Sequence, residues 1–132
     1  MSEQSYVKVE DIMSTNIETI DAMATVHDAV TKMRDAGVSS LVADRRDQTD
    51  EYGLVVVSDI AKQVVSKNRA PERVNVYEIM SKPVLTVPKD MNIRYAVRLL
   101  TQFGLSRGIV VDEHRAPVGI VTLRDLVLRH ID

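Results

Sequence analysis

The sequence contains no cysteine and no tryptophan, and only 4% of its 132 residues are aromatic. The absence of cysteine excludes disulfides and every cofactor that needs thiolate ligands, and nothing in the composition points to an oxidising compartment. Scarce aromatic side chains leave few platforms on which nucleic-acid bases could stack. A formal net charge of −2 gives no general attraction to a polyanion. We therefore expect no nucleic-acid partner.

Long hydrophobic runs are absent as well. No apolar stretch approaches the ~20 residues that a membrane-spanning helix needs, and the first residues are polar and lack the pattern of a secretion signal. The histidines, His27, His114 and His130, lack the paired spacing that metal sites favour. With 45% hydrophobic and 27% charged residues, the composition is that of one compact globular body. We expect a cytoplasmic protein without a membrane segment or a metal.

The two halves of the chain repeat one another. Corresponding pieces follow in the same order in both halves, apart from small differences in length, which indicates a tandem duplication. The clearest matches are Asp11–Ser14 with Glu78–Ser81, Gly37 with Gly104, and Gly53–Val55 with Gly119–Val121. We expect the first copy and a linker over residues 1–75 and the second copy over residues 76–132.

Each copy has the pattern of a strand, an amphipathic helix, two further strands and a closing helix. In the first copy, Thr25 is expected to cap a helix that buries Met33 and ends at Gly37. Asn68–Asn75 is the only stretch with the composition of a linker. The other expected strands and helices, with their apolar positions, are Ile17–Ile20, Ser40–Ala43, Leu54–Val57, Val84–Val87, Gly108–Val111, Gly119–Val121, a helix from Asn92 to Gly104 with Phe103 on its apolar face, and closing helices with Val65, Val127 and Ile131. A single copy cannot bury its sheet, so we expect the halves to pack together.

The most informative local segment is Gly119–Leu126, in which a buried strand leads directly into a helix. Thr122 and Asp125 have the spacing of a capping box. One interpretation is purely structural, with Thr122 as the helix cap and Asp125 as a favourable charge at the positive helix end. The other is that the helix start faces a phosphate, with Asp125 accepting hydrogen bonds from ribose hydroxyls. The spacing alone fits both.

The ordered set of pieces resembles the CBS domain, and two copies resemble a CBS pair, or Bateman module. The resemblance covers the chain from about Val9 to Ile131 and rests on Glu-Ile-Met-Ser, Ser-Arg-Gly-Ile-Val-Val-Asp and Gly-Ile-Val-Thr-Leu-Arg-Asp-Leu in the second copy. It implies an α/β (α+β) fold of tandem repeats. Each repeat is then a small three-stranded sheet with two packed helices, and a pseudo-two-fold axis relates the repeats.

The resemblance also implies a site for an adenosine nucleotide in the second copy. Asp125 then binds the ribose, Thr122 lies near the phosphate and Arg107 reaches the phosphate. Backbone around Val84–Thr86 and Gly108–Ile109 forms the adenine pocket. The expected ligand-binding residues are Thr122, Asp125, Arg107, Gly108, Ile109, Val84, Thr86 and Arg124, of which Arg124 fits a solvated charge equally well.

The first copy departs from this pattern. It keeps Asp59, but Val56 stands where the second copy has its threonine, and Ser40 stands where it has its arginine. These changes remove a hydroxyl and a charge-assisted contact, while Ser58 remains available as a helix cap. We therefore expect an asymmetric module with a weaker second site formed by Asp59, Ser40 and Thr19.

The function that this resemblance implies is that of a non-catalytic regulatory module. It is expected to bind AMP, ADP or ATP in a cleft between the repeats and to signal by a change of conformation or association. A homodimer and a separate effector enzyme or transporter are the implied partners. Two alternatives stay open: another adenosyl ligand, S-adenosylmethionine or NAD, and a ligand-free interaction module. The sequence shows no catalytic set of side chains, so no enzyme activity and no required cofactor are expected.

Overall fold

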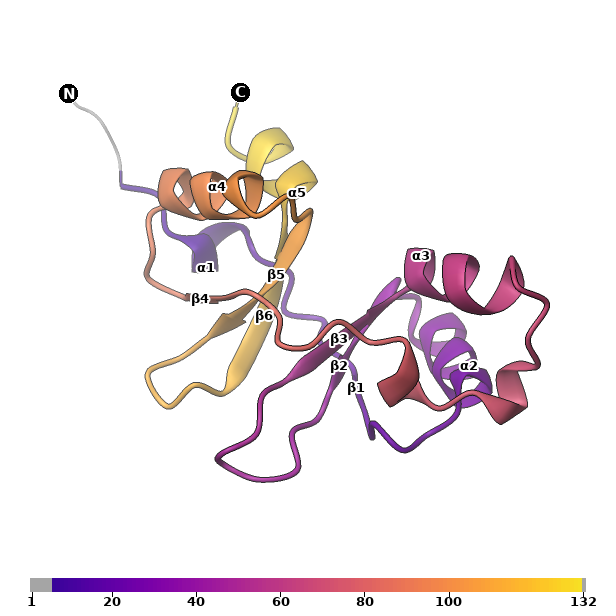
Figure 1. Ribbon diagram of the computed structural model, residues 1–132. Coiled ribbons are helices and arrows are strands. Elements are labelled where there is room, and N and C mark those ends of the chain that lie inside the picture. The colour runs from indigo at the N-terminus through magenta and orange to yellow at the C-terminus, as the bar shows by residue number, and fades with distance from the viewer. Residues whose placement is uncertain (1–5, 132) are drawn as a thin grey trace. The chain divides into compact units, whose positions relative to one another are not determined.

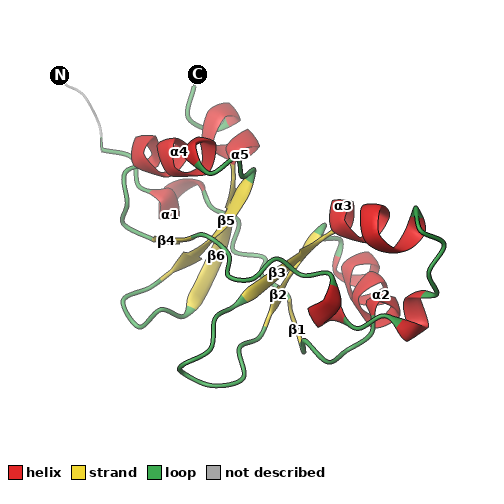
Figure 2. Ribbon diagram, in the orientation of Figure 1, coloured by secondary structure: helices red, strands yellow, loops and turns green. Residues whose placement is uncertain are grey.

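The computed structural model describes residues 6–131, which form two compact α+β units (Figure 1). One unit is Glu18–Val84. The other combines Leu85–Asp132 with the leading segment that ends at Ile17. Each unit holds a three-stranded sheet with helices packed on it, as the sequence predicts (Figure 2).

The Glu18–Val84 unit has the strand order β1-β2-β3, with β1 parallel and β3 antiparallel to the central strand. Its buried core residues come from both the sheet and the helices, and include Leu41, Val55 and Val64. Its elements are β1 (Thr19–Ile20), α2 (Val26–Ala36), β2 (Ser40–Ala43), β3 (Gly53–Val56), α3 (Val57–Ile60), which continues as a π-helical turn over Ala61–Val65, and two 3-10 turns, Pro71–Arg73 and Val76–Glu78.

The other unit repeats this topology with the order β4-β5-β6, again with one parallel and one antiparallel pairing. Its core includes Val9 from the leading segment together with Leu100 and Val121. Its elements are α1 (Val9–Ile12), β4 (Thr86–Pro88), α4 (Ile93–Gln102), β5 (Arg107–Val111), β6 (Pro117–Thr122) and α5 (Leu123–Leu128).

Local sequence signals set the bounds of α2. The Thr25 side chain accepts a hydrogen bond from the Asp28 backbone N–H at 3.1 Å, and the Asp28 carboxylate accepts one from the Thr25 N–H at 3.3 Å. Gly37 ends the helix in the left-handed region, at φ +69°. Met33 is buried in the core, as expected.

Four large apolar side chains that were expected on apolar helix faces are exposed instead. Phe103 is the C-cap of α4, so it has left the helical period that buries Leu100. Val65 ends the π-helical turn, whose wider winding shifts side chains off the α-helical face. Val127 and Ile131 lie in and beyond the short helix α5 and also face outward.

Each sheet is completed by the Ile-Met-Ser segment of the other sequence repeat. In one unit, a Cβ atom added to Gly53 would lie 2.6 Å from Met80 Sδ; in the other, one added to Gly119 would lie 2.4 Å from Met13 Sδ. Both segments also form backbone bridges to the neighbouring strand. The glycine of one repeat therefore provides room for the methionine of the other, and the compact units are bounded differently from the sequence repeats.

The stretch Asn68–Asn75 is a packed part of its unit. Val74 is buried, and its carbonyl accepts a hydrogen bond of 2.8 Å from the N–H of Val26 at the start of α2. Asn75 donates its side-chain amide to the carbonyl of Met23 at 2.8 Å. Although its composition is that of a linker, this segment packs against the beginning of α2 and holds it through these hydrogen bonds.

Candidate functional site

Three of the predicted ligand-binding residues meet at one end of the second sheet. Arg107, the first residue of β5, is paired in register with Thr122, the last residue of β6. The chain turns from Thr122 directly into α5, and the Thr122 hydroxyl accepts a hydrogen bond from the Asp125 N–H at 3.0 Å. The junction is held by a second bond, from the Leu123 N–H to the Ser106 carbonyl at 2.8 Å. The capping role of Thr122 is thus confirmed, and it fixes Asp125 close to the start of the strand that carries Arg107.

The carboxylate of Asp125 is partly buried, and contacts within the protein leave most of its hydrogen-bonding capacity unused. Its side chain is 29% exposed, and its only ion-pair contact among the described residues is with Arg124 at 3.8 Å. Because the Arg124 side chain is 78% exposed and the distance is too long for a hydrogen bond, this pair is weak. An ionised carboxylate can accept several hydrogen bonds, so Asp125 keeps most of its acceptor capacity for a ligand.

The backbone predicted to receive adenine lies at the same end of the sheet. Gly108 is buried, and a Cβ atom there would lie 3.2 Å from the Leu85 carbonyl oxygen. Ile109 is paired in register with Thr86, and its N–H already donates to the Leu85 carbonyl at 3.0 Å. A ligand therefore has to use backbone groups other than the Ile109 N–H. Val84, the remaining predicted residue, is the last residue of the other unit.

The first copy has the same backbone arrangement with fewer polar side chains. Ser40 is paired in register with Val56, and the Val57 N–H donates to the Ser39 carbonyl at 3.1 Å. Val56 is the N-cap of α3 and provides no side-chain hydrogen bond. Ser58 lies inside the helix, so it does not serve as the replacement cap. Asp59 is partly buried at the matching position.

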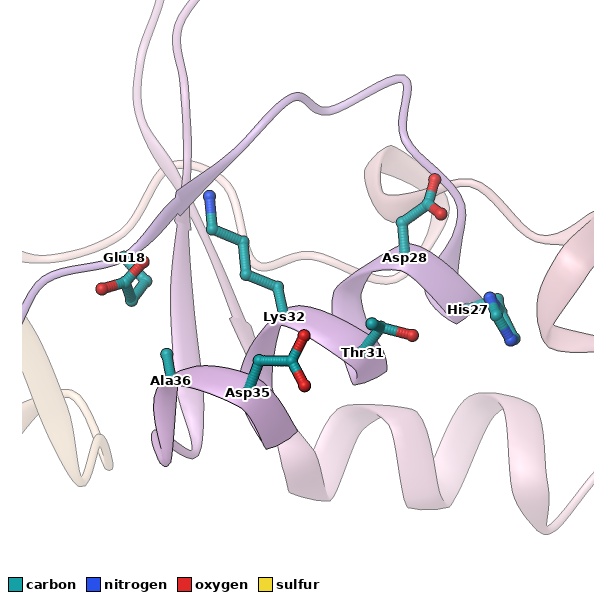
Figure 3. A pocket seen from close by; sticks show the side chains of 7 residues that line it. All are labelled: Glu18, His27, Asp28, Thr31, Lys32, Asp35 and Ala36. Atoms are coloured by element: carbon teal, nitrogen blue, oxygen red, sulfur yellow. The ribbon is translucent and has the colours of Figure 1, made fainter.

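Sequence reasoning missed a contact that involves Thr19 of the proposed weaker site. The ammonium group of Lys32, on α2, donates a hydrogen bond to the Thr19 carbonyl on the edge strand β1. Figure 3 shows the Lys32 side chain extending from α2 toward this strand. Lys32 also lines an open hollow of about 530 Å³. Three carboxylates line the same hollow, those of Glu18, Asp28 and Asp35. Because Lys32 already donates to the Thr19 carbonyl, this backbone acceptor is not free for a ligand.

A second missed feature is the ionic cluster around Asp50. Its side chain is 9% exposed and contacts Lys82 Nζ at 2.7 Å and Arg46 Nε at 3.2 Å. The Lys82 ammonium, followed by the backbone N–H of Arg46, holds the pKa of the Asp50 carboxyl well below its ordinary value of 3.8. Lys82 lies far from Asp50 in the sequence, so only the fold reveals the pair. The cluster ties the turn between β2 and β3 to the segment that leaves the Glu18–Val84 unit.

Two classes of site are absent from the part of the chain that the structure describes. Residues 6–131 contain no group of three or more histidine or carboxylate side chains placed to hold a metal ion. None of the helices within this range has the length and apolar character needed to span a lipid bilayer.

Curated relatives match nearly the whole chain but are longer than it is. A protein of Methanopyrus kandleri is 31% identical over 121 residues, which is 92% of this chain and 61% of that protein. A 33.4 kDa protein of Thermofilum pendens is 27% identical, and the match covers 96% of this chain and 44% of that protein. The chain thus corresponds to about half of these relatives.

Solved structures share the fold. A hexameric CBS-CP12 protein from bloom-forming cyanobacteria superimposes with a TM-score of 0.90 at 31% identity, over 96% of this chain and 69% of that one. The CBS domain pair of protein MJ0100, solved with 5′-methylthioadenosine and S-adenosylmethionine, has a TM-score of 0.77 at 25% identity, over 92% and 94% of the two chains. A CBS domain protein of Pyrobaculum aerophilum, solved with AMP, has a TM-score of 0.80 over 92% of both chains, and at 18% identity it supports the fold alone.

The sequence pattern of the CBS domain matches this chain twice, over residues 9–66 and 76–131. The two matches together cover most of the chain, and each contains one copy of the repeat with its three strands and two main helices. The chain therefore belongs to the CBS domain family and carries a pair of CBS domains.

Proposed function

We propose that this CBS pair is a non-catalytic regulatory module that binds an adenosine nucleotide at the Arg107 end of the second sheet. The observation that carries the proposal is the pairing of Arg107 with Thr122 and the fixing of Asp125 by the Thr122 cap. A partly exposed carboxylate suits the two neighbouring hydroxyls of a ribose, and a guanidinium suits a phosphate. The arrangement thus offers complementary groups for both halves of AMP, ADP or ATP.

The ligands of the related structures support the adenosine part of this proposal. The MJ0100 pair was solved with two adenosyl compounds and the Pyrobaculum protein with AMP. Adenine and ribose are common to all three ligands, whereas the phosphate is present only in AMP. In this chain Arg107 favours a phosphate, so we place S-adenosylmethionine, which has none, second. NAD carries a diphosphate and stays an alternative that titration has to separate from AMP, ADP and ATP.

The first copy is proposed as the weaker site. It offers Asp59 but has neither the hydroxyl nor the guanidinium of the second copy. In addition, the Thr19 carbonyl is engaged by Lys32. The groups left for a ligand there are the Asp59 carboxylate and the Ser40 hydroxyl, since the Thr19 carbonyl already accepts a hydrogen bond from Lys32.

Regulation requires that the nucleotide bind two states of the module with different affinities. We propose that these states differ in conformation or in self-association, and that the module acts as a homodimer on a separate enzyme or transporter. The hexameric state of the CBS-CP12 neighbour provides a precedent for assembly in this fold.

Isothermal titration of the chain with AMP, ATP, S-adenosylmethionine and NAD tests the ligand. We expect AMP or ATP to bind most tightly. The matched variant Arg107→Gln should lose affinity for AMP while binding adenosine as the original chain does, because adenosine has no phosphate. Tightest binding of S-adenosylmethionine would replace the nucleotide, and no binding of any of the four would favour the ligand-free interaction module.

A further inference from the structure

The first sheet has a hollow at the end opposite to Asp59. The strands β1 and β2 are parallel neighbours, and the chain leaves them at Asp21 and Asp44, which both line this hollow. The outer ends of neighbouring parallel strands are a common place for ligands in α/β proteins. The hollow has a volume of about 590 Å³, which is within the range of sites for small molecules.

Hydrogen bonds and ion pairs hold the walls of this hollow in place. On one side, the N–H of Tyr77 donates to the Ala22 carbonyl at 2.9 Å and fixes the turn that follows β1. On the other side, the largely buried carboxylate of Asp50 contacts both Lys82 and Arg46. A ligand therefore meets preformed walls and does not have to order them, which lowers the cost of binding.

The charged side chains that line the hollow are balanced in number, and several of them are unpaired. Three are cationic and three are anionic, and Asp50 already pairs with two of the cations. The third cation is Arg45, whose guanidinium lies over the Tyr52 ring, 4.9 Å from its centroid. Within residues 6–131, neither Arg45 nor the carboxylates of Asp21 and Asp44 have an ion-pair partner. One guanidinium and two carboxylates are thus free to bind a ligand.

Such a lining selects against ligands that carry charge of one sign. A phosphate would be attracted by Arg45 but repelled by Asp21 and Asp44, and a simple cation would meet the reverse. A ligand with both signs satisfies both, since carboxylates accept hydrogen bonds from an ammonium group and a guanidinium binds a carboxylate through two parallel hydrogen bonds. Met80 and Tyr77 line the same hollow and offer contacts for an apolar group.

The second sheet does not repeat these charges. At the same register positions it has Pro88, Val111 and Asp112 in place of the three free charged residues of the first sheet. The Asp112 carboxylate accepts hydrogen bonds from two backbone N–H groups of its own turn, at 2.8 and 2.9 Å. The same sheet is therefore built without these free charges in the second copy, so the packing of the sheet does not account for them in the first.

We propose that the hollow of the first sheet binds a free α-amino acid with an apolar side chain. The ammonium group of the ligand lies against the two free aspartates, its carboxylate against Arg45, and its side chain against Met80 and Tyr77. This site uses none of the residues proposed to bind the nucleotide. It goes beyond the proposed function by giving the module a second ligand of a different chemical class.

An NMR titration of the ¹⁵N-labelled chain tests the site. At least one of L-leucine, L-methionine and L-phenylalanine should shift the backbone amide signals of residues 21–23 and 44–46 at concentrations up to ~10 mM. The N-acetyl and amide derivatives of the same amino acid each lack one of the two charges, so they should bind at least ~10-fold more weakly. No shift with any of the three amino acids would overturn the site. Equally tight binding of either derivative, or tighter binding of inorganic phosphate, would overturn the assignment of the ligand.

Two variants remove free charges without changing the cluster around Asp50. Arg45→Gln and Asp44→Asn should each weaken amino-acid binding at least ~10-fold. Arg73→Gln, at an exposed arginine of the same unit that does not line the hollow, is the matched control and should bind as the original chain does. Unchanged affinity in both Arg45→Gln and Asp44→Asn would overturn the inference. Titration of the same variants with AMP reports on the nucleotide site separately, and circular dichroism checks the fold of each.

Discussion

Replacing Asp125 with asparagine keeps the size of the side chain and removes its charge, which makes it the sharpest test of the proposed nucleotide site. A carboxylate can accept hydrogen bonds from both ribose hydroxyls, whereas the amide retains a single acceptor oxygen. A hydrogen bond to a charged group contributes about 1.5–3 kcal/mol. Loss of one such bond should therefore raise the Kd for AMP roughly 10- to 150-fold.

The cost to the fold should be small. The ion pair of Asp125 with Arg124 is long and exposed, and the Thr122 cap uses the backbone N–H of residue 125 rather than its carboxylate. Only the interaction with the helix dipole is lost, about 0.3–1 kcal/mol of unfolding free energy. Calorimetric titration with AMP measures the affinity, and Asp59→Asn in the first copy is the matched control, expected to leave most of the binding intact. Equal losses in the two variants would refute the asymmetry, and an unchanged Kd in Asp125→Asn would refute the site.

Three further predictions concern stability, measured by chemical denaturation. Gly119→Ala should lower the unfolding free energy by about 1–3 kcal/mol, because the new methyl group meets backbone as well as a methionine side chain. The loss should be larger than in Gly53→Ala, where the methyl group meets side chains alone. Equal losses in the two variants would contradict this packing. Thr122→Val should cost about 1 kcal/mol through the lost helix cap, and no loss would show that the cap is replaced by water. Asp50→Asn should destabilise the protein at neutral pH. The lowered pKa of Asp50 means that its contribution is complete above the ordinary pKa of 3.8 and is lost as the pH falls below it, so the difference between the two proteins should shrink in acid. A difference that is constant with pH would mean that the ion pair with Lys82 contributes nothing.

Much of the fold could be predicted because its determinants are local. Thr25 and Gly37 mark the two ends of α2, and Ser40–Ala43 forms β2 as expected. The strand-to-helix junction at Thr122 was also predicted, since the threonine and the following acidic residue lie within one helical turn. Such signals act between neighbours in the chain and do not depend on tertiary contacts.

The remaining features depend on contacts between residues that are distant in the sequence. The Ile-Met-Ser segment is visible in both copies, but nothing local indicates that Met13 packs on Gly119 rather than on the glycine of its own copy. The bond of Lys32 to the Thr19 backbone carbonyl and the ion pair of Lys82 with Asp50 likewise join groups that only the fold brings together. A charged residue in a polar stretch is most simply interpreted as solvated, so the sequence alone does not indicate these contacts.

The two copies differ in the groups that reach solvent and agree in the groups that build the sheets. Both have the glycine that admits a methionine and the backbone bond that closes the strand-to-helix junction. They differ at the cap, where Thr122 corresponds to Val56, and at the start of the central strand, where Arg107 corresponds to Ser40. Since the fold tolerates either set, stability does not require the difference. A bound nucleotide would use the polar groups that only the second copy has, so the proposed site gives this asymmetry a physical reason that the packing of the sheets does not.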